Sequence, residues 1–193
     1  MGTQFTEVYN RFLGKITDDM YMELTPEDTM RDLMSLLIDA IPKFEFPRKN
    51  LEDYTIDTLV KREDGVVEGD FVIGVVWNTP EEESETIPDV LIEHSSFTAE
   101  LTSEEINILA YLMMCDWVQR QLTSIENIRM KYSGSDFKMT SQANHLAKLL
   151  SLSTDCKNKA LHYQRLYKRR RPESTKGFES NWDVFRSGIY GKY

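Results

Sequence analysis

The apolar residues near the N-terminus first recur at helical spacing. The stripe is formed by Phe5, Val8, Tyr9, Phe12, Leu13 and Ile16. This periodicity predicts a short amphipathic helix near residues 4–16, which the acidic pair Asp18-Asp19 ends.

A second helical stripe begins after Thr25. Threonine can cap a helix, Pro26 suits the first turn, and Asp28 holds the capping-box position. These signals predict a helix that Pro42 closes. Its apolar stripe is Met30, Leu33, Met34, Leu37, Ile38 and Ile41.

Residues 43–101 follow a different pattern, typical of a small antiparallel β-element inserted between helices. KFEFP at 43–47 looks extended, and a short LEDY turn follows at 51–54. The β-rich, glycine-punctuated stretch TLVKREDGVVEGDFVIGVVWN comes next, and SSFTAEL near 95–101 predicts a further strand. Between them lie four glutamates, interpreted as a mobile acidic loop and less plausibly as a metal site: Glu81, Glu82, Glu83 and Glu85.

Two long helices are then predicted, joined by the polar segment SGSDFK at 133–138. Thr102 and Glu105 form a second capping box, and Ser141 is the cap expected for the next helix, with a break allowed around Ser151–Thr154. At about 25–28 residues each, the helices would form an α-hairpin roughly 40 Å long. The core positions expected are Ile106, Leu109, Ala110, Met113, Met114, Trp117, Leu122, Ile125 and Ile128 in the first helix, and Leu146, Leu149, Leu150, Cys156, Ala160, Leu161 and Tyr167 in the second.

After Arg171 the helical pattern stops at Pro172, yet the remaining residues are rich in aromatics. A disordered tail is normally poor in them, so these residues are interpreted as docking anchors. The fold expected is mainly α: a helical bundle over 1–171 with a long α-hairpin and a small β-rich insertion at about 43–101, and an extended C-terminal arm at 172–193. The candidate partner-binding residues are Arg169, Arg170, Arg171, Phe178, Trp182, Phe185, Ile189, Tyr190 and Tyr193.

The formal net charge of −9 is divided unevenly along the chain. Residues 1–116 carry −18 and residues 117–193 carry +9. Such asymmetry suggests either a basic arm for nucleic acid or a molecule whose two ends attract one another, as in a head-to-tail ring. The segment 157–171 has no acid and seven basic residues: Lys157, Lys159, Arg165, Lys168, Arg169, Arg170 and Arg171.

No motif predicts catalysis. SGSDFK is not a phosphate-binding loop, because a helix precedes it, it has a single glycine, and Met139 follows Lys138. The three histidines are scattered, and HExxH, CxxC, GxSxG and a dinucleotide-binding glycine pair do not occur. We therefore expect no catalytic residue, no cofactor and no metal.

The two cysteines and the absence of long apolar runs bear on location. Cys115 and Cys156 fall within helical patterns, which favours buried free thiols in a reducing compartment over a disulfide. No apolar run approaches the roughly 18 residues of a membrane span. A soluble intracellular protein without a membrane partner is expected.

In order of elements the chain resembles the neck proteins of tailed bacteriophages, and among them the head–tail connector (adaptor) proteins that bind beneath the portal. The resemblance covers roughly residues 20–170. It depends on a capped helix LTPEDTMRDLMSLLIDAI, a β-containing insertion, a long helix LTSEEINILAYLMMCDWVQRQL, the stretch MKYSGSDFKMTSQANHLAKLL and a basic, aromatic C-terminal arm. The insertion at about 43–100 is longer than compact adaptors carry.

The resemblance implies a structural protein of the virion neck, made in the host cytoplasm and assembled as a ring, commonly of twelve copies, around the DNA channel. Its partners would be the portal protein, neighbouring copies of itself and the next neck or tail protein, with non-specific proximity to genomic DNA. Two alternatives stay open. One is a nucleic-acid-binding regulatory protein that uses the basic helix end at 157–171, and the other is a phage stopper or tail-completion protein.

Overall fold

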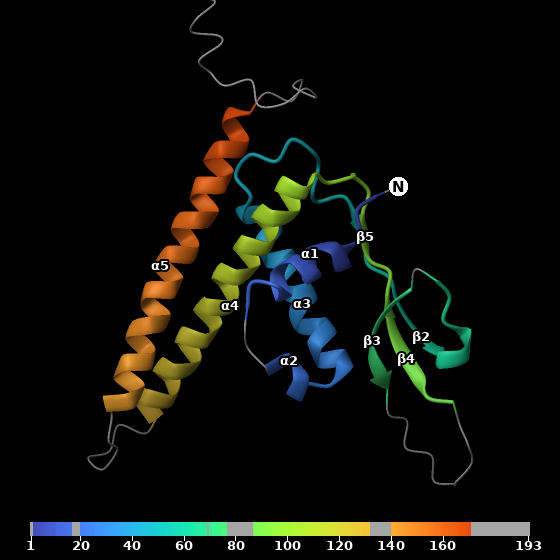
Figure 1. The fold of residues 1–193 in the computed structure, drawn as a ribbon, viewed down its shortest axis with the longest axis horizontal. Coiled ribbons are helices and arrows are strands. Elements are labelled where there is room, and N and C mark those ends of the chain that lie inside the picture. The colour runs from blue at the N-terminus through green and yellow to red at the C-terminus, as the bar shows by residue number, and fades with distance from the viewer. Residues whose placement is uncertain (1, 17–19, 69, 77–86, 132–139, 171–193) are drawn as a thin grey trace, which may run out of the picture.

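The computed structural model describes residues 2–16, 20–68, 70–76, 87–131 and 140–170. The chain is mainly helical and has a small β-region at one side (Figure 1). The helices are α1 (Phe5–Leu13), α2 (Met20–Glu23), α3 (Pro26–Ala40), α4 (Ser103–Lys131) and α5 (Thr140–Arg169). The strands are β1 (Tyr54–Thr55), β2 (Thr58–Arg62), β3 (Phe71–Val76), β4 (Asp89–Glu93) and β5 (Ser96–Phe97), and short 3₁₀ turns occupy Ile41–Lys43 and Glu63–Gly65.

The helix starts follow the capping signals in the sequence. At α3 the Thr25 hydroxyl accepts the Asp28 N–H at 3.2 Å, which confirms the predicted cap. At α4 the Thr102 hydroxyl accepts the Glu105 N–H at 3.3 Å, and the Glu105 carboxyl accepts the Thr102 N–H at 2.7 Å. This reciprocal pair is the capping box that the sequence predicted.

The first helix is shorter than the predicted 4–16, and a short helix that the sequence did not predict, α2, comes before α3. Asp18 and Asp19, expected to end the first helix, lie outside the described residues. The buried side of α1 consists of Phe5, Thr6, Val8, Tyr9 and Phe12.

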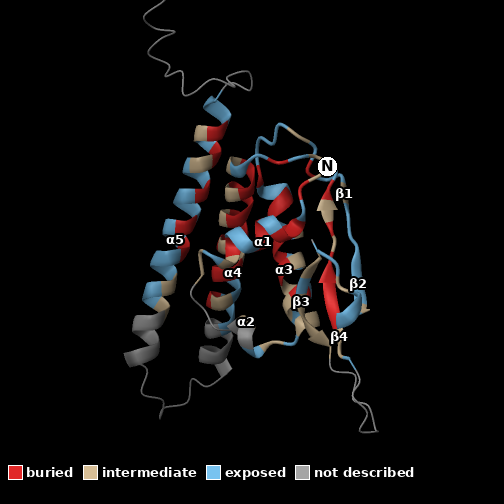
Figure 2. Cartoon of the chain, turned by 45° about the vertical axis from the view of Figure 1, so that its right-hand side comes forward, coloured by how far each residue is buried: buried red, intermediate tan, exposed pale blue. Residues whose placement is uncertain are grey.

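Helix α4 forms the centre of the core and packs against α1, α3 and α5. Figure 2 shows buried positions where α1, α3 and α4 face one another and exposed positions along the outer side of α5. Fully buried side chains of α4 include Ile108, Leu109 and Met113. The apolar stripe of α4 therefore packs against the neighbouring helices and holds them together.

Helix α5 lies beside α4 and runs antiparallel to it. The rings of Tyr111 and Tyr163 stack with centroids 5.0 Å apart, and the Cys115 and Cys156 sulfurs lie 3.0 Å apart. Pairs whose residue numbers rise on one helix and fall on the other define an antiparallel arrangement. The predicted joint at 133–138 lies outside the described residues.

The structure corrects three expectations for α5. The helix begins at Thr140, one residue before the predicted cap Ser141, and it is continuous through 151–154. There the Thr154 hydroxyl donates to the Leu150 carbonyl at 3.0 Å, so this side chain is accommodated within the helix. Leu150 and Leu161, expected in the core, are exposed. Cys156, Ala160 and Tyr167 are buried as predicted, and so are Ser153 and Gln164, which the sequence did not assign to the core.

The insertion forms two antiparallel sheets, as the sequence predicted in outline. β1 pairs with β5, and β2, β4 and β3 form a three-stranded sheet in that order. The sequence missed β4, and the stretch 43–47, predicted as extended, contains the end of a 3₁₀ turn and no strand. Only Ser96–Phe97 of SSFTAEL is a strand, and the acidic loop with Glu81–Glu83 and Glu85 lies outside the described residues.

The N-terminal segment ties the insertion to the helices. Thr3 donates its N–H to the Ala99 carbonyl at 3.2 Å and accepts the Phe97 N–H at 2.8 Å. Its hydroxyl accepts the Leu101 N–H at 2.6 Å. The Phe5 ring then packs against Phe97, with centroids 4.7 Å apart. The chain end thus joins the two-stranded sheet to the start of α4.

Candidate functional site

The sequence placed its candidate partner-binding residues at and beyond the end of α5. Of these, the structure describes Arg169 and Arg170. The others lie outside the described residues: Arg171, Phe178, Trp182, Phe185, Ile189, Tyr190 and Tyr193. The described part of the candidate site is therefore the C-terminal end of α5.

Arg48 closes the C-terminal end of α5. Its Nη2 donates to the Tyr167 carbonyl at 2.5 Å and also to the Arg170 carbonyl. Its guanidinium carbon lies 4.2 Å from the centroid of the Tyr167 ring. The last carbonyls of a helix have no partner within the helix, and a cation there also complements the helix dipole. Arg48 thus caps the helix from a segment 119 residues away in sequence.

Tyr167 connects this cap to the start of α4. It is 1% exposed, and its hydroxyl donates to the Glu105 carboxyl, which is 2% exposed. The same hydroxyl accepts the Arg48 N–H at 3.3 Å. Burial first, and then the bond to Glu105, raise the pKa of Tyr167 to about 12. The phenol therefore remains a protonated donor at neutral pH.

Three further contacts hold the segment around Arg48 against α5. The Gln164 side chain, which is buried, accepts the Glu45 N–H at 2.9 Å. The Lys168 ammonium lies 3.7 Å from the centroid of the Phe46 ring, and Phe44 packs edge-on against Tyr167 with centroids 5.4 Å apart. We call residues 44–48 the strap, because they fasten the last turns of α5 to the body of the molecule.

The two described arginines at the helix end differ in their surroundings. Arg170 forms an ion pair at 2.8 Å with Glu104, in the first turn of α4, and both side chains are partly exposed. Arg169 is exposed. The exposed cationic surface of α5 also includes Lys157, Lys159, Arg165 and Lys168. The guanidinium of Arg170 thus contacts an acid of its own chain, whereas these other cationic side chains are exposed.

Sequence reasoning missed the strap and the acids that complete this site. Arg48 and Phe44 lie in a stretch interpreted as the edge of the β-insertion, where nothing periodic marks them. Glu105 was recognised only as the capping-box partner of Thr102, and Glu104 was not among the candidate site residues. No short-range signal was available, because each partner is at least 62 residues away in sequence.

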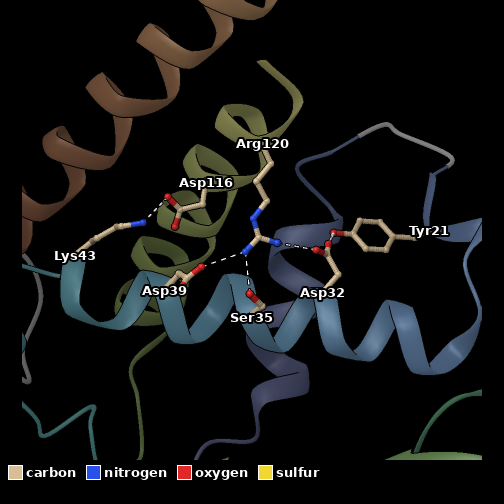
Figure 3. Close-up of polar contacts among 7 residues, drawn as sticks. All are labelled: Tyr21, Asp32, Ser35, Asp39, Lys43, Asp116 and Arg120. Atoms are coloured by element: carbon tan, nitrogen blue, oxygen red, sulfur yellow. Dashed lines mark hydrogen bonds and ion pairs between the residues drawn. The ribbon is translucent and has the colours of Figure 1, made fainter. Parts of the chain in front are cut away.

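A second polar cluster joins α3 to α4 (Figure 3). The Arg120 guanidinium contacts Asp32 at 2.7 Å, Ser35 at 2.9 Å and Asp39 at 3.1 Å. Beside this cluster, Lys43 pairs with Asp116 at 2.5 Å. The Arg120–Asp39 and Lys43–Asp116 pairs both line a cleft of about 570 Å³. Because the cations here are paired with acids of the same cleft, the cluster fits a brace between helices better than a ligand site.

A metal site and a membrane-spanning helix each place specific requirements on the described residues. Among them, no three His, Cys, Asp or Glu side chains are grouped so that they could hold a metal ion. His94 lies 3.2 Å from Asp70, which also pairs with Lys61 at 3.1 Å. None of the helices, as far as they are described, combines the length and apolarity that crossing a membrane requires.

No protein-family model, no curated protein and no solved structure matches the chain.

Proposed function

We propose that this chain is a structural virion protein, a head–tail connector (adaptor) of a tailed bacteriophage. It forms a ring beneath the portal and joins capsid to tail around the DNA channel. Residues 1–171 are the body, in which α4 and α5 are the two halves of one long α-hairpin. Residues 172–193 are an extended arm that docks on the portal or on a neighbouring copy. No catalytic residue, cofactor or metal belongs to this function.

The observation that carries the proposal is the strap at the end of α5. A docking arm transmits force only if its base is fixed, and a frayed helix end would not hold it. Here Arg48 caps the last carbonyls, and Tyr167 joins the cap to buried Glu105. The arm therefore leaves from a base fastened to both long helices, with exposed Arg169 next to it.

The distribution of charge supports assembly into a ring. Helix α5 has six lysines and arginines and one acidic residue. The described part of the insertion after residue 50 has ten acidic and two basic residues. These two regions lie on opposite sides of the molecule (Figure 1). Opposite charges on opposite sides favour a head-to-tail contact between copies, and such contacts close into a ring when the rotation allows.

Deleting residues 173–193 tests the proposed arm. We expect the truncated chain to keep its helical circular dichroism and its Tm, because the described core and the strap are formed by residues 2–170. We expect it to lose binding to rings of the portal protein encoded in the same genome, measured by co-sedimentation. Binding of the truncated chain at native affinity would refute the role of the arm.

Two matched variants separate anchoring side chains from mere chain length. Replacing Trp182, Phe185 and Tyr190 with alanine is expected to weaken portal binding at least 10-fold, because buried aromatics dominate binding energy at interfaces. Replacing Ser174, Thr175 and Ser180 with alanine is the control and should change binding little. Equal losses in the two variants would contradict anchoring by the aromatics.

The exposed basic surface of α5 favours a second candidate, a nucleic-acid-binding regulatory protein. It is formed by Lys157, Lys159, Arg165, Lys168 and Arg169. This candidate predicts DNA binding that weakens steeply with salt, since each neutralised phosphate releases counterions. Fluorescence anisotropy with a duplex DNA, at low and at physiological salt, measures it. No binding by the purified protein at low salt would rule out this candidate.

A further inference from the structure

The two cysteines of the chain meet inside the body, on different helices. Cys115 on α4 and Cys156 on α5 place their sulfurs 3.0 Å apart, although they are 41 residues apart in sequence. Both thiols are free, and they are 9% and 2% exposed. The sequence predicted that each would be buried, but it gave no reason to place them together.

The surroundings make the two thiols unequal. The hydrogen bond with Cys156 lowers the pKa of Cys115, although burial opposes this shift. The same hydrogen bond and burial raise the pKa of Cys156. Cys156 also lies 3.5 Å from the Tyr111 carbonyl, an acceptor for its S–H. Because the thiolate is the reactive form, Cys115 is the sulfur expected to react first with an oxidant.

We propose that Cys115 and Cys156 are a redox-responsive dithiol, whose oxidation by a peroxide links α4 to α5 through a disulfide. The inference does not depend on the proposed adaptor function, because both sulfurs lie within the body of one chain. A disulfide bond is about 2.05 Å long, so the sulfurs need to approach by only about 1 Å.

The reaction proceeds in two balanced steps. The Cys115 thiolate attacks one oxygen of hydrogen peroxide, the O–O bond breaks, and the products are a sulfenic acid on Cys115 and one water after protonation. The Cys156 sulfur then attacks the sulfenic sulfur; the S–S bond forms, the S–O bond breaks, and the hydroxyl leaves as a second water with the Cys156 proton. The two thiols supply the two electrons that reduce peroxide, and a reducing dithiol reverses the link by exchange.

The bond would act on the helix that carries the proposed arm. Between the two ends of α5, Ser153, Cys156 and Ala160 are buried, and Leu149 and Tyr163 pack against the core. A disulfide between these helices would prevent α5 from separating from α4. In the reduced form the two helices could still separate locally.

The test compares the full-length protein, reduced and then treated with hydrogen peroxide. We expect intact mass to fall by two hydrogens and peptide mapping to recover a linked pair containing Cys115 and Cys156. The Tm should rise by about 5–10 °C in the oxidised form and return after dithiothreitol, because the link restricts the unfolded chain. Thiols that stay free in the folded protein, or that oxidise only to sulfinic acid, would overturn the proposal.

Single variants provide the control. Cys115→Ser and Cys156→Ser each leave one thiol, so neither should show an internal link or a Tm that responds to peroxide. If serine prevents folding, alanine at the same positions is the replacement. The comparison of reduced and oxidised wild-type protein does not require either variant. A redox-dependent Tm that persists in both single variants would refute the pair, as would disulfide-linked dimers in place of an internal link.

Discussion

Replacing Glu105 with alanine is expected to lower the free energy of unfolding by about 2–4 kcal/mol, which is measurable by urea denaturation followed by circular dichroism. The carboxyl accepts the Thr102 N–H at 2.7 Å, so its loss removes half of the capping box. It also leaves the hydroxyl of buried Tyr167 without its acceptor. An unpaired buried donor costs about 1–3 kcal/mol, so it accounts for most of the effect.

The adjacent residue provides a matched control. Glu104 lies in the same helical turn, so the helix dipole acts similarly on both residues. Its partner Arg170 is 2.8 Å away in a partly exposed pair, and such pairs are worth less than about 1 kcal/mol. We therefore expect Glu104→Ala to cost less than about 1 kcal/mol. Equal losses at the two positions would contradict a special role for the buried network.

A conservative variant identifies the source of the loss. Glu105→Gln keeps an acceptor for Tyr167 and remains compatible with a capping box. We expect it to retain most of the stability that alanine loses. If glutamine destabilised the protein as much as alanine does, the negative charge and not the hydrogen bonding would be the important property.

Replacing Gly74 with alanine is expected to lower the free energy of unfolding by about 1–3 kcal/mol in the same assay. A Cβ atom at this position would lie 2.7 Å from Cγ and 3.3 Å from Cβ of Pro26. Gly74 belongs to β3, next to a bulge, and Pro26 begins α3, so the substitution would push the three-stranded sheet away from the helices. The proline ring cannot move aside as a flexible side chain could.

Gly65 is the control for this substitution. A Cβ atom there would meet nothing within 4 Å. Alanine also reduces the entropy of the unfolded chain, which favours folding by about 0.4–1 kcal/mol where the backbone permits it. We expect Gly65→Ala to be neutral or slightly stabilising. If the two variants behaved alike, close packing of β3 on α3 would not be what Gly74 is needed for.

The helices that carry the strongest local signals were predicted well. Thr25 caps α3 and the Thr102–Glu105 box begins α4, as expected from residues three apart. The stripe of Leu109 and Met113 is buried as its period indicated. Such signals can be read from sequence because a cap or a helical stripe involves neighbours within about four residues.

The errors occur where tertiary packing outweighs local pattern. Leu150 and Leu161 were assigned to the core but are exposed, whereas Ser153 and Gln164, which were not assigned to it, are buried. β4 was missed, although its central residues Val90, Leu91 and Ile92 are buried. Its partners β2 and β3 both come earlier in the chain, and β4 becomes the middle strand only when the sheet is assembled.

By itself, then, the sequence determined a mainly helical chain with a small antiparallel insertion, buried cysteines and a separation of charge. The tertiary structure alone decided that Arg48 and Glu105 meet at Tyr167, that Cys115 lies against Cys156, and that β3 rests on Pro26. The physical reason is sequence distance: periodicity and capping act over one helical turn, whereas these contacts join residues 41 to 119 positions apart.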